Sequence, residues 1–257
     1  MKKLTLAVAL TAMMSASSAM ASGYYSNKVC KGLPSHADLS YAINEVVDAG
    51  QNGGIGNEMW LSVVNRDGVV CGVARSGEKG QQWPGSRVIS AQKANTANAF
   101  SLPAEGQNGA ALALSTANLW AAVQPGGSLF GLQHSNPVDT KVAYRGNGHI
   151  WGTPKDPLVG KKVGGVNVFG GGLAIYDSYG NLLGGIGVSG DTSCTDHIVA
   201  WRVRQALGLD NLPGGVGSPG DNIILDPTNG FGHPECFDLP GTGNHVDIAN
   251  GLTLSAP

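Results

Sequence analysis

Charged residues are scarce in this chain of 257 residues, at 13%, and the formal net charge is only −2. Lysine and arginine form no cluster beyond Lys161-Lys162. The sequence therefore lacks the basic patch by which nucleic-acid-binding proteins neutralise phosphates. We expect no nucleic-acid partner.

Long apolar runs are also missing. The run Leu4 to Met14 is shorter than the roughly 20 residues that a membrane-spanning helix needs. It follows Lys2-Lys3 and precedes Ala19-Met20-Ala21, which is the order of a basic region, an apolar region and a cleavage site. We therefore predict that residues 1–21 are a signal peptide and that the protein is periplasmic or secreted, without membrane insertion.

Only four cysteines are present, and no two have the C-x-x-C spacing of zinc or redox sites. An even number of cysteines in an exported protein indicates disulfides, and four cysteines allow three pairings. We favour the pairs Cys30–Cys71 and Cys194–Cys236, because each would tie a terminal extension to the central body.

Glycine, in contrast, is abundant, with 40 residues and no collagen-type period. This composition favours tight turns and close backbone packing. Two hairpins are predicted where apolar runs flank a short polar turn. The first joins Met59–Val64 to Val69–Ala74 through Asp67-Gly68, and the second joins Leu173–Asp177 to Leu182–Val188.

Helical spacing of apolar residues, with suitable start and stop residues, predicts four helices. These are Ser35 to Gly50, Ser86 to Phe100, Ala110 to Ala122, and Ser193 to Leu207. Hairpins with helices between them favour an α+β fold, in which helices cover one antiparallel sheet. We place this domain at residues 22–208.

Two Gly/Pro-rich segments show no clear periodicity. Residues 128–170 form a long insertion, and a loop of this length is uncommon in a compact domain unless it is functional or partly ordered. Residues 209–257 are expected to form an extended arm on the surface. We expect five of its ionisable residues to be exposed there, namely Asp221, Asp226, His233, Asp238 and His245.

Several motifs identify a family. They are Ala91–Ala97 with Lys93 at its centre, Gly171–Ile175, Gly184–Gly190, and Val63–Gly68, in which Asn65 stands where an acidic residue is usual. With Asp196 they resemble the GlcG/HbpS-like family of haem-binding proteins, to which haem degradation is also ascribed. The resemblance covers roughly residues 36–208. It implies a profilin-like fold, frequent homo-oligomers, and binding of haem or a related tetrapyrrole in some members.

The glycine-rich corner Gly187-Val188-Ser189-Gly190 lies between a predicted strand and a predicted helix. Free N–H groups at a helix start attract anions, so Gly187, Ser189 and Gly190 are candidate ligand-binding residues. Alternatively, the glycines only permit a tight crossover. The corner is not the G-x-S-x-G elbow of hydrolases, because Asp191 takes its last position. No residue orients His197 for a triad with Ser189.

Lys93 lies on a helix that otherwise shows small residues toward the core. It could pair with a carboxylate such as Asp196, or with a propionate of a ligand. The alternative is a solvated lysine that buries only its stem. Both Lys93 and Asp196 are candidate ligand-binding residues.

Two of the six histidines, His134 and His149, lie in the insertion near Tyr144 and Trp151. Histidine and aromatic residues could line a haem pocket, with His134 as a candidate ligand of the iron. The alternative for each histidine is a solvated side chain. The sequence has no C-x-x-C-H motif for covalent haem and no H-E-x-x-H motif for zinc.

These observations favour an exported protein that binds haem or a related planar anionic molecule. One alternative is an enzyme that degrades haem or transforms another small molecule at the Gly187–Gly190 corner. Another is a non-catalytic accessory module of an exported oxidation system. The sequence does not decide whether the protein is an enzyme.

Overall fold

The computed structural model describes residues 28–103 and 112–255, so the predicted signal peptide lies outside the described residues. The centre is a four-stranded antiparallel sheet with the order β2-β1-β4-β3. Its strands are β1 (Trp60–Asn65), β2 (Val70–Arg75), β3 (Gly172–Tyr176) and β4 (Leu182–Ser189). Both predicted hairpins are confirmed, and the α+β fold class is confirmed with them.

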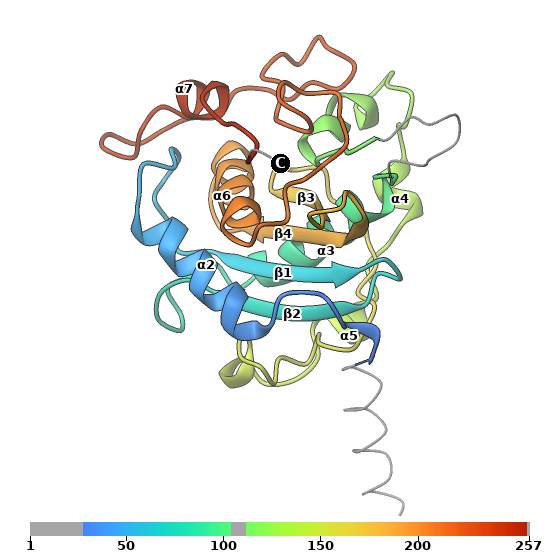
Figure 1. Cartoon of the computed structure of the whole chain (residues 1–257), viewed down its shortest axis with the longest axis vertical. Coiled ribbons are helices and arrows are strands. Elements are labelled where there is room, and N and C mark those ends of the chain that lie inside the picture. The colour runs from blue at the N-terminus through green and yellow to red at the C-terminus, as the bar shows by residue number, and fades with distance from the viewer. Residues whose placement is uncertain (1–27, 104–111, 256–257) are drawn as a thin grey trace, which may run out of the picture.

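Helices cover both faces of this sheet (Figure 1). On one face lie α2 (His36–Asp48) and α6 (Ser193–Ala206), and on the other lies α3 (Ser86–Ala99). Side chains of β1 alternate between the two layers. Leu61 and Val63 pack under α2 and α6, whereas Trp60 and Val64 pack under α3, so the whole strand is buried.

Local sequence signals explain where these helices begin. Ser35 caps α2 in a reciprocal capping box with Asp38. Thr192 caps α6 by accepting the N–H of Thr195. All three helices were predicted, and each lies within a residue or two of its expected bounds.

The fourth predicted helix, over residues 110–122, is wrong in its described part. Leu112 pairs with Leu102 and Ala113 with Gly215, and two short 3-10 helices follow, η2 (Ala117–Leu119) and η3 (Ala121–Val123). Side chains here form hydrogen bonds that compete with those of a helix. The Thr116 hydroxyl, for example, accepts the N–H of Gly172. Pairing with distant segments therefore overrides an Ala/Leu-rich composition.

The insertion at residues 128–170 is ordered around short elements, α4 (Leu132–Ser135), α5 (Thr140–Ala143) and η4 (Gly148–Ile150). It is anchored on the α3 side of the sheet, where Ala143, Leu158 and Val163 join the core. A buried ion pair between Arg87 of α3 and Asp156 fixes it further. The anchoring side chains are buried, while many of the turns between them are exposed.

The C-terminal segment is more deeply integrated than we expected. It includes α7 (His245–Asn250), which contacts α6 (Figure 1). Asp221, His233 and His245 are buried, so their predicted exposure is wrong. The reason is long-range pairing, because Asp221 forms an ion pair with Arg204 of α6. Asp226, in contrast, is exposed as predicted.

Both favoured disulfides are present, Cys30–Cys71 and Cys194–Cys236. The first ties the segment before α2 to β2, and the second ties the C-terminal arm to the first turn of α6. Among the described helices, none is both long and apolar enough to cross a membrane.

Candidate functional site

The predicted contact between Lys93 and Asp196 exists and is buried. Lys93 Nζ lies 2.6 Å from Asp196 Oδ2 and donates a second hydrogen bond to the carbonyl of Val188, at 3.0 Å. The Lys93 side chain is 0% exposed and that of Asp196 is 4% exposed. The pair therefore links α3 to α6 across the end of β4.

The carboxylate of Asp196 also binds the glycine-rich corner. Its Oδ1 accepts the N–H of Gly190 at 3.0 Å and the N–H of Asp191 at 2.9 Å. These are N–H groups that an anionic ligand would use at this corner. The protein supplies its own anion here, since Asp196 stands in the first turn of α6.

The corner is also closely packed. A Cβ atom added to Gly187 would lie 2.0 Å from the carbonyl oxygen of Ser90 in α3. Gly190 lies against the backbone of Met59, and Ser189 is buried. In this structure the glycines allow α3 to approach β4 closely, which is the alternative that we weighed for the corner.

Burial shifts the pKa values of the pair toward its neutral form. It raises the pKa of Asp196 to about 6 and lowers the pKa of Lys93, while the attraction between the two charges opposes both shifts. Asp196 is therefore ionised at neutral pH and accepts three hydrogen bonds. A buried, paired and fully hydrogen-bonded carboxylate is stable in this position.

A small cavity of about 200 Å³ lies beside the corner, between α2, α6 and the C-terminal arm. Val47, Met59 and Val199 form its apolar wall, and Asp191 and Thr195 are among its polar groups. The carboxylate of Asp191 is itself bound by the N–H groups of residues 55–57. Sites for drug-sized molecules measure roughly 300–1,000 Å³, so this cavity cannot enclose a tetrapyrrole.

The two candidate histidines of the insertion lie apart from the Lys93–Asp196 pair. His134 is exposed on α4, a few residues after the exposed side chains of Leu129 and Phe130. His149 is exposed on η4. The candidate site residues therefore form two separate groups, a buried one at the corner and an exposed one on the insertion.

His149 lies beside a cleft in the α3-side layer. The cleft measures about 140 Å³, and its wall is almost wholly apolar, with Trp60, Pro84 and Trp151 among its residues. Lys79 also lines the cleft, and its Nζ lies 2.5 Å from Nδ1 of His149. A charged lysine can only donate in this contact, so Nδ1 of His149 would be the acceptor.

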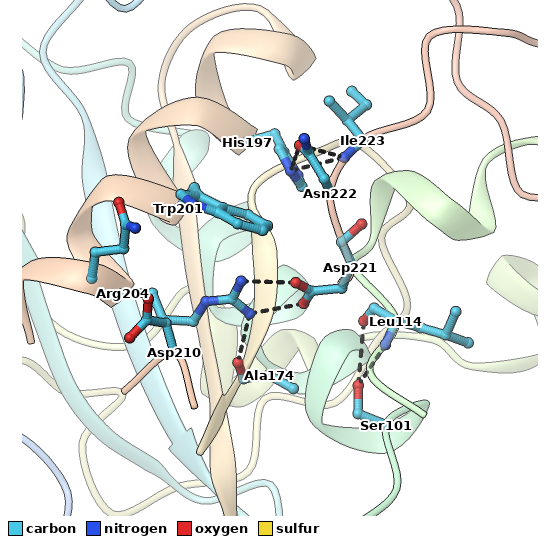
Figure 2. Close-up of polar contacts among 12 residues, drawn as sticks. Ser101, Leu114, Ala174, His197, Trp201, Arg204, Asp210, Asp221, Asn222 and Ile223 are labelled. Atoms are coloured by element: carbon cyan, nitrogen blue, oxygen red, sulfur yellow. Dashed lines mark hydrogen bonds and ion pairs between the residues drawn. The ribbon is translucent and has the colours of Figure 1, made fainter. Parts of the chain in front are cut away.

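A polar network between α6 and the C-terminal arm was missed from the sequence. Figure 2 shows Arg204 binding both carboxylate oxygens of Asp221, at 2.7 and 2.8 Å, and the carbonyl of Ala174 at 3.1 Å. Nearby, Nε2 of His197 lies 3.1 Å from the N–H of Ile223. The signal in the sequence was Arg204, a charged residue in a predicted helix with many apolar positions, which needs an acidic partner when it is buried.

Burial determines the charge state of His197. It lowers the pKa of this side chain to about 4, although the carboxylate of Asp221 acts in the opposite direction. His197 is therefore neutral at physiological pH. It holds the arm in place as a hydrogen-bonding group and not as a charge.

Comparison with known proteins identifies the family. The sequence model of the HbpS-like haem degrading proteins matches residues 35–204. This range includes Lys93, Asp196, the glycine-rich corner and the insertion, and it ends before the C-terminal arm. None of the curated proteins compared with this chain matches it.

Three solved structures are similar at low identity. A PduOC–heme complex has a TM-score of 0.45 at 22% identity, with 68% of this chain and 94% of that chain covered. The protein ORFY of Klebsiella pneumoniae has a TM-score of 0.43 at 22% identity, with coverages of 67% and 89%. A double mutant of Streptomyces reticuli HbpS has a TM-score of 0.37 at 18% identity, with coverages of 68% and 87%.

The identities to these structures are low, so the assignment depends on the sequence model of the family. That model spans well over half of the chain, and the protein therefore belongs to the HbpS-like haem degrading protein family.

Proposed function

We propose that this protein is exported and binds haem or a related planar anionic tetrapyrrole. The observation that carries the proposal is the family match over residues 35–204. Two features support export. Residues 1–21 have the order of a signal peptide, and the chain has two disulfides, which persist in oxidising compartments.

The insertion is the proposed place of binding. A haem needs an apolar surface for its ring, a ligand for its iron and a cation for its propionates. The surroundings of His149 offer all three kinds of group, with Trp60 and Trp151 in the cleft, His149 beside it and Lys79 as the cation. His134 lies on the same insertion, a few residues after the exposed side chains of Leu129 and Phe130, and we rank it second as the iron ligand.

The dimensions of the cleft limit how much of the ring it can hold. At about 140 Å³ it would hold one edge of a tetrapyrrole. The rest of the ring would lie on exposed apolar side chains at its rim, such as Trp83, which is 50% exposed. We propose that a second copy of the chain covers this exposed part, as in a homo-oligomer.

Titration with haemin tests the proposal directly. The mature chain should shift the Soret band of haemin and change it in proportion to protein concentration. His149→Ala should weaken binding by at least about tenfold, whereas His134→Ala should have the smaller effect. A spectrum that remains that of free haemin at every protein concentration would refute haem binding.

Haem degradation is the second candidate, because the family description names it. In that case the complex should lose its Soret band after ascorbate is added in air, at a higher rate than free haemin does. A band that decays no faster than that of free haemin would limit the protein to binding.

A further inference from the structure

A second group of chemically active residues lies where the C-terminal arm meets the first turn of α6. Each of Cys194, His233 and Cys236 offers one ligand atom, and these atoms all lie within 4.8 Å of one another. Cys194 and His233 are buried, and Cys236 is partly buried. His233 and Cys236 belong to the arm, beyond the residues that the family model matches.

The imidazole of His233 is oriented as in a metal site. Its Nδ1 lies 2.7 Å from the carbonyl oxygen of Pro234, so Nδ1 carries the proton and Nε2 presents its lone pair. Nε2 accepts from the hydroxyl of Ser193, the residue before Cys194, at 2.8 Å. Histidines that bind metals almost always donate their other ring N–H to a carbonyl or a carboxylate.

A second histidine of the arm has the same arrangement. His245 Nδ1 lies 2.8 Å from the carboxylate of Asp238, and its Nε2 accepts the backbone N–H of Cys236 at 3.1 Å. Two histidines thus converge on one disulfide, each held through its Nδ1. Among the described residues no comparable group includes Cys30 or Cys71, so the arrangement is not a general feature of disulfides in this chain.

We propose that the Cys194–Cys236 disulfide is the oxidised form of a metal site that binds Zn²⁺ or a similar thiolate-preferring ion when it is reduced. Cys194, His233 and Cys236 are the ligands, and the fourth position is open to water. This set matches the sulfur and nitrogen ligands of tetrahedral zinc sites.

The chemistry balances with a dithiol reductant. Two electrons from the dithiol break the Sγ–Sγ bond, each sulfur takes up one proton, and the dithiol becomes a disulfide. Binding of Zn²⁺ then releases both thiol protons. Cys194 stands in the first turn of a helix of 14 residues, where the dipole favours its thiolate.

Only small movements are required. With Zn–S distances of about 2.3 Å and Zn–N distances of about 2.0 Å, ligand atoms of a tetrahedral site lie roughly 3.5–3.8 Å apart. Once the disulfide is broken, the two sulfurs must separate to this spacing, and the nitrogen of His233, which lies within 4.8 Å of both, must reach it. Rotation of the cysteine side chains provides such shifts once the bond is broken.

Cobalt titration of the mature chain tests the proposal. The protein is reduced with a phosphine, freed of reductant without air, and titrated with Co²⁺, which reports thiolate ligation through charge-transfer and ligand-field bands. We expect one Co²⁺ per chain in the reduced protein and no bands in the oxidised protein. Zn²⁺ should displace the cobalt and abolish the bands.

Matched variants locate the site. C30S/C71S leaves only the C-terminal disulfide and should keep the bands, whereas C194S/C236S should lose them. H233N should weaken binding by at least the roughly 10–100-fold that is lost when an outer partner of a metal ligand is removed. Circular dichroism of each reduced protein shows whether the fold is retained.

Three outcomes would overturn the proposal. One is a reduced, folded wild type without cobalt bands. Another is a band that persists in C194S/C236S or disappears in C30S/C71S. The third is a reduced C30S/C71S protein that unfolds and does not refold when Zn²⁺ is added, because the proposed site requires the folded arm.

Discussion

The glycine-rich corner and the face of the insertion near His149 differ in how their polar groups are used. At the corner, Asp196 accepts hydrogen bonds from Lys93, Gly190 and Asp191, and all of them are buried. On the insertion, His149 is exposed beside an apolar cleft, and its ring lies 2.5 Å from Nζ of Lys79. The polar groups of the corner are therefore bonded within the protein, whereas the insertion is where we propose that the ligand binds.

This difference separates the residues that identify the family from the residues that we propose bind the ligand. The glycines and the charged pair that mark the family maintain the contact between α3, β4 and α6. They do not predict a ligand, because their hydrogen-bond donors and acceptors are already bonded within the protein. The histidines that we propose as iron ligands lie in the insertion, the segment with the weakest sequence pattern.

Substitution at the buried pair should have the largest effect on stability. Lys93→Met leaves the carboxylate of Asp196 buried without its partner, which costs about 3–5 kcal/mol. Urea unfolding followed by tryptophan fluorescence would measure this loss. Lys162→Met, at an exposed lysine, is the control and should change stability by less than about 0.5 kcal/mol.

The double variant K93M/D196N refines this test. Asparagine retains an oxygen that accepts the N–H groups of Gly190 and Asp191, but it carries no charge. Stability should therefore recover in part relative to Lys93→Met. A Lys93→Met protein that is as stable as wild type but no longer binds haemin would contradict this contrast, because the corner would then be part of the ligand site.

The close approach of α3 to β4 predicts the second-largest loss of stability. Gly187→Ala places a methyl group against the backbone of α3 and should cost about 2–3 kcal/mol. Gly85→Ala is the matched control, because an added Cβ there meets no atom within 4 Å. Gly187→Ala should have a lower midpoint of thermal unfolding than Gly85→Ala. Equal midpoints would show that the backbone at the corner can shift to accept the methyl group.

The interface between α6 and the arm predicts a dependence on pH. The pKa of His197 is lowered by burial to about 4, so its stabilising effect is present above its ordinary pKa of 6.5 and is lost as the pH falls toward 4. Between pH 7 and pH 5 the loss is about 2 kcal/mol. His197→Gln should abolish this part of the pH dependence.

Denaturant unfolding of wild type and His197→Gln at both pH values isolates the contribution of His197. Asp196 acts in the opposite direction, because its raised pKa stabilises the folded protein as the pH falls through about 6. Asp196 is present in both proteins, so its contribution cancels in the comparison. An identical pH dependence of the two proteins would show that His197 is not a buried neutral group.

The elements that local sequence determines were predictable. The Asp67-Gly68 turn lies between the two strands of the first hairpin, and Ser35 and Thr192 cap their helices. The Lys93–Asp196 pair was also accessible, because a lone lysine among small residues needs a carboxylate.

Elements that depend on distant partners were not predictable. The segment at residues 110–122 has a helical composition, but Leu112 and Ala113 pair with other segments instead. Asp221 looked like a turn residue until Arg204 was found beside it. The distance between the insertion and the corner likewise depends on packing across the sheet, which no local pattern records.

The most direct test of the account is a haemin titration that compares variants from both regions. Asp196→Asn changes the corner and H134A/H149A changes the insertion, and both are measured where circular dichroism shows a folded chain. We predict that Asp196→Asn binds haemin as wild type does, and that H134A/H149A loses the Soret shift while its stability changes by less than about 0.5 kcal/mol. Loss of binding in Asp196→Asn with normal binding in H134A/H149A would contradict the account.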